Sequence, residues 1–127
     1  YFDENFFLYL ENDDLCLRKK NENDLIYVLK KAKIHHLGGM SHNAIYKKEI
    51  EYSRNWHWMW SKFYFNLKHY GYLIAFLKTL PSMISSIIKI LFYFLTFNSY
   101  KKKIYLMRFL GLYNSMMGKS SWYRPKI

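Results

Sequence analysis

Between residues 52 and 70, large apolar side chains recur every three or four residues, and this spacing restricts the fold of the 127-residue chain more than any other feature. Residues spaced in this way lie on one face of an α-helix. We therefore expect a long helix that starts near Ser41, with Ser41 or Asn43 as its cap, and buries a continuous face. That face consists of Ile45, Tyr52, Trp56, Met59, Phe63, Leu67 and Tyr70. Aromatic residues on its other faces predict either a helix covered on several sides or one at a membrane interface.

Two more helices are expected after Gly71, which ends or kinks the first. Thr79-Leu80-Pro81 is typical of a helix start, because proline is tolerated in the first turn. Residues 82–97 are strongly apolar, and the 22 residues between Lys78 and Lys101 are long enough to span a bilayer. However, Lys89 lies in the middle, and a polar stripe runs along one side, formed by Ser82, Ser85/Ser86, Lys89, Tyr93 and Thr96. The stripe favours a helix in the interface plane, or one that packs its stripe against protein, over a spanning helix. Residues 104–113 predict a last amphipathic helix, ending near Gly118.

Charge is distributed very unevenly along the chain. Residues 1–51 hold all nine Asp and Glu together with eight Lys and Arg, whereas residues 52–127 hold twelve Lys and Arg and no carboxylate. A segment without carboxylates cannot neutralise its own lysines, so it needs an anionic partner, either nucleic acid or anionic lipid. Twenty of the 27 aromatic residues lie in the same segment. Since Trp and Tyr suit the headgroup layer, we expect an anionic membrane surface and no nucleic acid.

The N-terminal part predicts short extended runs around one helix. Residues 6–10 and 25–29 are continuous aromatic and aliphatic runs, which indicate strands or buried extended segments. Between them, residues 13–20 predict a helix, capped by Asn12 or Asp13, with acidic residues in its first turn and basic residues in its last. This mixture predicts an α/β part up to about residue 41.

Two polar clusters are candidates for chemistry. Glu11-Asn12-Asp13-Asp14 precedes the cationic turn, and His35-His36 precedes a pair of glycines. The acidic residues have a simple alternative role as helix cap and first-turn residues. A histidine without partners is usually an ordinary surface or core residue rather than a metal ligand. The two clusters alone therefore do not identify a function.

The run from Phe2 to Arg18, followed by Ala32, His36, Gly38-Gly39 and Ser41, resembles the second half of the catalytic domain in family 2 glycosyltransferases, closest to their rhamnosyltransferase-like branch. The resemblance covers residues 2–41. It implies a GT-A fold, a nucleotide-sugar donor, a divalent cation (Mg²⁺ or Mn²⁺) and inversion at the anomeric carbon.

The resemblance also assigns roles to individual residues. Asn12 stands where the family has its catalytic base, and an amide cannot accept the proton. The catalytic group is therefore expected among Glu11, Asp13 and Asp14, with Glu11 as the favoured base. His36 matches a histidine that ligates the metal in some members. Four residues match acceptor-side or structural positions of the family: Asn12, Asp14, Arg18 and Ser41.

These observations predict an α/β chain: residues 1–41 as the C-terminal part of a GT-A domain, and residues 42–127 as a basic, aromatic, mostly helical extension on the membrane. The expected function is sugar transfer to a glycan or lipid-linked acceptor in cell-envelope polysaccharide synthesis, at the cytoplasmic face of the membrane as a peripheral or monotopic protein. Because the nucleotide-binding half is not in this sequence, we expect a fragment that is inactive alone. The alternative is a non-catalytic protein that binds a membrane surface or nucleic acid.

Overall fold

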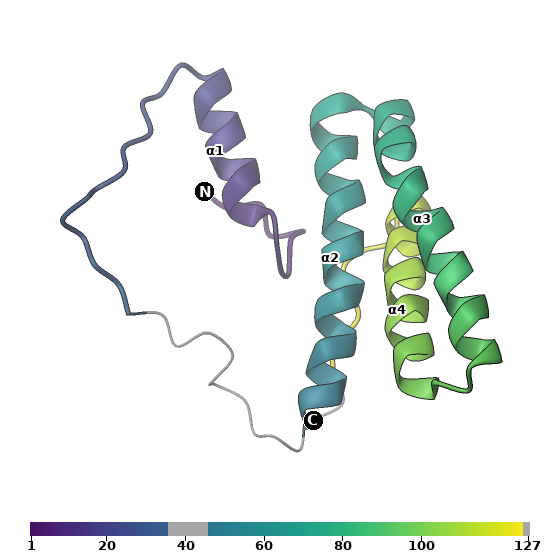
Figure 1. The fold of residues 1–127 in the computed structure, drawn as a ribbon. Helices are drawn as coiled ribbons and strands as arrows, with labels where there is room; N and C mark the ends of the chain where they lie inside the picture. Colours follow the sequence, from purple (N-terminus) through teal and green to yellow (C-terminus); the bar gives the residue numbers. More distant parts are fainter. Residues whose placement is uncertain (36–45, 126–127) are drawn as a thin grey trace.

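The computed structural model describes residues 1–35 and 46–125, and within them the chain forms four helices (Figure 1). These are α1 (Glu11–Asn21), α2 (Lys47–Tyr70), α3 (Tyr72–Leu95) and α4 (Ser99–Met116). The helices α2, α3 and α4 pack against one another as a bundle, and α1 lies on the side of α2 away from α3. The short connections make α3 antiparallel to both α2 and α4, so α2 and α4, which also pack against each other, run parallel (Figure 1).

The core of the bundle lies where its three helices meet. Met59 and Phe63 from α2, Ala75 from α3 and Leu112 from α4 are all fully buried there. Partly buried apolar side chains surround this cluster: Leu67, Phe76, Met83 and Met116. The bundle therefore has a small core of its own.

The predicted α/β fold class is wrong, because the described residues contain helices and no strand. Instead of an extended run, residues 6–10 form an irregular turn in which Tyr9 and Leu10 have φ near +68° (69° and 67°). Residues 25–29 have no regular structure, and their five apolar side chains are exposed. A strand is stable only when a neighbouring strand pairs with its backbone groups. Neither run has such a neighbour among the described residues, so the predicted GT-A part does not form.

The predicted short helix does form, as α1. Its first turn holds Glu11, Asp13 and Asp14, and its last turn holds basic residues, as expected from the helix dipole. The predicted cap is wrong, since the helix begins one residue before Asn12 and Leu10 stands at the cap position with no side-chain hydrogen bond.

The long helix predicted from apolar spacing is α2. On the predicted apolar face of α2, four residues are buried: Tyr52, Trp56, Met59 and Phe63. Tyr70, at the end of that face, is exposed. The predicted cap residues and Ile45 lie outside the described residues.

Gly71 separates α2 from α3 as predicted, with φ of 82°, a value that favours glycine. The predicted start at Pro81 is wrong, because α3 begins at Tyr72 and continues through this proline. The last predicted helix is α4, where the Asn98 side chain accepts a hydrogen bond from the Lys101 backbone N–H at 3.0 Å. Gly118 follows its end with φ of 68°.

Candidate functional site

The predicted catalytic residues lie at the start of α1, but they do not converge on one point. Asn12 and Asp13 are exposed to solvent, whereas Asp14 is fully buried. Glu11 is intermediate, and its Oε2 atom is buried without a hydrogen-bond partner among the described residues. Asp13 and Asp14 therefore point to different sides of α1, so that the Asp13 carboxylate is accessible to solvent and the Asp14 carboxylate is not.

Asp14 is the centre of an ion cluster between α1 and α2. Its carboxylate accepts hydrogen bonds from Arg18 Nε at 2.9 Å, Lys68 Nζ at 2.8 Å and His69 Nε2 at 2.9 Å. Burial raises the pKa of Asp14, but the hydrogen bonds from Lys68, Arg18 and His69 outweigh burial and hold that pKa below its ordinary value. A carboxylate saturated by three donors is a poor proton acceptor, so Asp14 fixes α1 on α2 rather than acting as a base.

Asp3 extends the cluster to the N-terminal turn. It accepts hydrogen bonds from Lys68 Nζ at 2.7 Å and from the Tyr64 hydroxyl at 3.1 Å. Burial raises the pKa of Asp3, but the bonds from Lys68, Asn5 and Tyr64 together lower it to about 2. Sequence reasoning missed Lys68 and His69, which belong to a helix more than fifty residues away, and no local signal identifies such a pair.

The other predicted site residues have structural roles or lie outside the described residues. Arg18 pairs with Asp14 and donates to the Tyr1 carbonyl oxygen at 2.7 Å. His36 and Ser41 belong to the part of the chain that is not described. Within residues 1–35 and 46–125, no three His, Cys, Asp or Glu side chains lie close enough to hold a metal ion. Because the predicted ligand His36 is not described, the divalent cation stays a prediction.

His57, which sequence reasoning did not select, is fully buried against the C-terminal segment. Its Nε2 donates to the Tyr123 carbonyl oxygen at 2.8 Å, and the Ser121 hydroxyl lies 3.0 Å from its Nδ1. Burial lowers the pKa of His57 to about 4. The hydrogen bond to Tyr123 raises this pKa in part, and the positive charge of Arg124 lowers it further. The neutral ring therefore holds the tail on α2.

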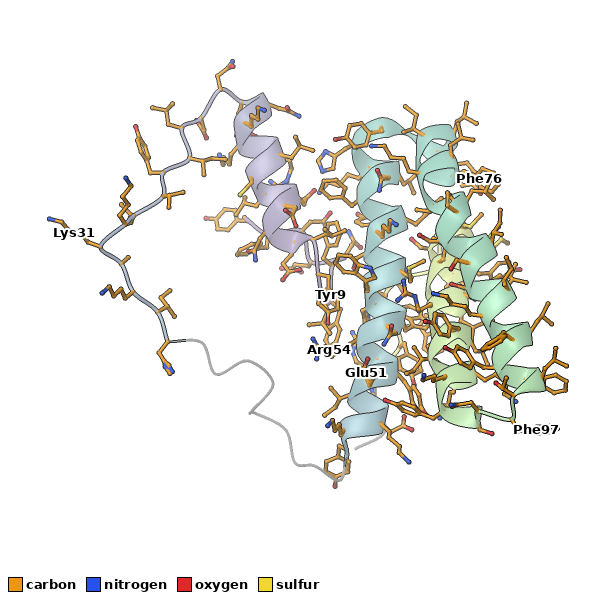
Figure 2. The ribbon with its side chains drawn as sticks, in the orientation of Figure 1. Tyr9, Lys31, Glu51, Arg54, Phe76 and Phe97 are labelled. Atoms are coloured by element: carbon orange, nitrogen blue, oxygen red, sulfur yellow. The ribbon has the colours of Figure 1, made fainter. Side chains whose placement is uncertain are left out.

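A shallow groove of about 300 Å³ opens between the N-terminal turn and α2. Arg54 Nε donates to the Tyr9 hydroxyl at 2.9 Å, and Trp58 packs edge-on against Tyr9 with 5.4 Å between ring centroids. Figure 2 shows Tyr9, Arg54 and Glu51 following one another along this side of α2. These contacts attach the N-terminal turn to the bundle.

The described fold leaves the outward face of α3 uncovered. In this helix the buried residues are small or weakly polar, namely Ala75, Thr79 and Ser86. Ten large apolar side chains are exposed on the opposite side, and they form what we call the outward face: Leu73, Ile74, Leu77, Ile84, Ile87, Ile88, Leu91, Phe92, Phe94 and Leu95. Phe97, labelled in Figure 2, continues this exposed apolar surface past the end of α3 with 92% of its area accessible. By length and composition α3 is the one described helix that could cross a membrane.

The polar stripe of α3 lies beside its neighbours in the bundle. Ser82 Oγ accepts a hydrogen bond from Lys62 Nζ of α2 at 2.9 Å, and Tyr93 stacks on Tyr105 of α4 with 5.6 Å between centroids. Lys89 Nζ lies 4.8 Å from the centroid of the same Tyr105 ring. The polar stripe therefore packs against protein, which is one of the two arrangements expected from the sequence. The apolar side of α3 points away from α2 and α4.

No protein-family model, curated protein or solved structure matches this chain. Together with the strand-free fold of the described residues, this overturns the identification of residues 2–41 as part of a family 2 glycosyltransferase. The similar run from Phe2 to Arg18 forms a turn and a helix anchored by ion pairs.

Proposed function

We propose that this chain binds the surface of anionic membranes through the outward face of α3. The observation that supports the proposal is the exposure of ten large apolar side chains along one face of a single helix. Contiguous apolar patches of this kind are uncommon on soluble monomers and mark interaction sites. Membrane attachment is the non-catalytic alternative that the composition already indicated.

The hydrophobic contribution to binding is substantial. Fully burying a leucine, isoleucine or phenylalanine side chain contributes about 1.5–3 kcal/mol. The ten outward-face residues start about half exposed, so each gains on the order of 1 kcal/mol on immersion. The sum is on the order of 10 kcal/mol, and the acyl boundary accepts such a face without further protein contacts.

Electrostatics favours an anionic surface over the other possible occupants of this face. Residues 52–127 carry twelve Lys and Arg and no carboxylate, and each cation near an anionic leaflet contributes about 1 kcal/mol. Lys78, Lys101 and Lys102 lie at the two ends of the outward face, each stacked on an aromatic ring. A second copy of this chain would bring like charges together, so a dimer through α3 is disfavoured.

A pair of charge-matched double variants tests the proposal. Leu77→Glu/Leu91→Glu places two carboxylates on the outward face, and its partition onto vesicles of phosphatidylcholine and phosphatidylglycerol should fall at least about tenfold, a change of 1.4 kcal/mol or more. Leu25→Glu/Leu29→Glu changes the net charge equally at exposed residues away from α3 and should keep most of its binding.

The two double variants also distinguish binding through the outward face from binding through net charge, and two further measurements test the other possible partners. Equal losses in both double variants would mean that net charge alone drives binding, and the proposal would be wrong. Sedimentation velocity without lipid reports on self-association through α3, and titration with RNA reports on a nucleic-acid partner.

A second candidate function, sugar transfer from a nucleotide-sugar donor, is favoured by one observation. The buried Oε2 of Glu11 has no hydrogen-bond partner among the described residues, so no protein donor there occupies its lone pairs. In a longer chain that has transfer activity, Glu11→Gln should lower turnover by about 10²–10⁴-fold. Asp13→Asn is the comparison: if it abolished turnover while Glu11→Gln did not, Asp13 would be the base.

A further inference from the structure

The bundle brings charged side chains to the middle of each helix beside α3. Lys62 of α2 donates to Ser82, which lies near the midpoint of α3. Arg108 lies at the middle of α4, with its Nη2 atom 3.9 Å from Met59 Sδ. Lys89 of α3 itself stacks on Tyr105 in the same region. All three helices therefore carry a cation in their central part.

These cations restrict how α3 can enter a bilayer. Since α2 and α4 pack against α3 in one bundle, they would accompany it through the hydrocarbon if it crossed. Lys62 and Arg108 would then lie close to the bilayer centre, where charged side chains are strongly disfavoured and are found facing water-filled cavities or paired with opposite charges. The hydrogen bond from Lys62 goes to a neutral hydroxyl, and among the described residues neither Lys62 nor Arg108 forms an ion pair with a carboxylate.

The lysines of α3 give a second, independent argument. Lys78 and Lys89 are eleven residues apart, close to three helical turns, so they lie on the same side of the helix and about 16 Å apart along its axis. Each is held on an aromatic ring, Lys78 at 4.1 Å from the Tyr70 centroid and Lys89 at 4.8 Å from that of Tyr105. In a crossing helix the two ammonium groups would differ in depth by those 16 Å. In a helix parallel to the surface both reach the phosphate layer at once.

We infer that α3 lies flat in the interface of an anionic membrane, immersing its outward face without crossing, while Lys78 and Lys89 line one edge of that face at the level of the phosphates. The inference rests on the proposed membrane binding and specifies its geometry. In this arrangement α1 faces water, because it lies on the side of α2 away from α3 (Figure 1).

Depth measurements at three positions test this geometry. Leu73, Ile84 and Leu95 are also eleven residues apart, so they follow one line along the exposed side of α3. Each is replaced singly by cysteine in a Cys16→Ser background, labelled with a fluorophore, and bound to phosphatidylcholine–phosphatidylglycerol vesicles that carry spin labels at known depths. Wild-type protein labelled at the exposed Cys16 of α1 is the control for a water-facing site.

A flat helix gives three similar, shallow depths and no quenching at Cys16. A depth at position 84 about 16 Å greater than at positions 73 and 95 would overturn the inference while leaving membrane binding intact. Co-sedimentation of the wild-type chain with the same vesicles separates the two proposals, since a lack of binding would contradict both. If labelling impairs binding, oriented circular dichroism of the unmodified chain decides: helices parallel to the surface support the inference, and helices along the membrane normal overturn it.

Discussion

Gly111 of α4 lies against the backbone of Trp56 in α2, so closely that a Cβ atom at Gly111 would overlap the Trp56 carbonyl oxygen and lie 2.9 Å from its carbonyl carbon. Both residues are buried at this crossing. The approach lets α4 pack directly on α2, one of the contacts that keep the bundle together without help from α1.

Gly111→Ala should therefore destabilise the bundle. The methyl group meets backbone rather than a flexible side chain, so the helices must move apart, and overpacking of this kind costs about 1–3 kcal/mol. Urea unfolding followed by circular dichroism measures the free energy of unfolding. Tyr113→Ala, at an exposed position of the same helix, is the control, and a stability of Gly111→Ala equal to that of wild type would show that the helices are not in close contact here.

Asp14→Asn should release α1 from α2. The amide leaves Arg18 and Lys68 without the charge that pairs them, and removing one partner of a buried ion pair costs on the order of 3 kcal/mol. Hydrogen exchange should then be faster in α1 while α2 to α4 keep their protection. The exposed neighbour Asp13→Asn should change exchange little, and equal effects of the two variants would remove Asp14 from its anchoring role.

His57 should make stability depend on pH. Its pKa is about 4 in the folded chain against an ordinary 6.5, so below pH 6.5 the unfolded chain binds a proton that the folded chain excludes. The free energy of unfolding should be greatest above pH 6.5 and fall by about 3 kcal/mol as the pH decreases to 4. His57→Gln should lose this slope; a slope that persists in the variant would assign it to other groups.

The helices could be predicted from the sequence because their signals are local. The spacing from Tyr52 to Phe63 defines the buried face of α2, and Gly71 marks its end. Pro81 misled the prediction of α3, since proline is typical of a first turn but here lies within a helix whose packed face supports it.

The errors arose where the structure depends on distant partners. Apolar runs such as residues 25–29 become strands only beside another strand, and a single run cannot indicate whether one is present. Asp14 carried the right signal for a first-turn residue, but its partner Lys68 lies more than fifty residues away. The polar stripe of α3 was visible in the sequence, whereas the contacts it makes with α2 and α4 required the fold.

The intact chain should bind anionic lipid through both electrostatic and apolar contributions. Wild-type protein is mixed with vesicles of phosphatidylcholine alone or with phosphatidylglycerol, over a range of salt concentrations, and the bound fraction is measured by co-sedimentation. We expect stronger binding to the anionic vesicles than to phosphatidylcholine alone. This binding should weaken as salt rises, because the screening length falls from about 10 Å at 0.1 M to about 3 Å at 1 M. Some binding should remain at high salt, because salt does not remove the apolar contribution of the outward face. No binding to anionic vesicles, or binding independent of both lipid charge and salt, would contradict the account.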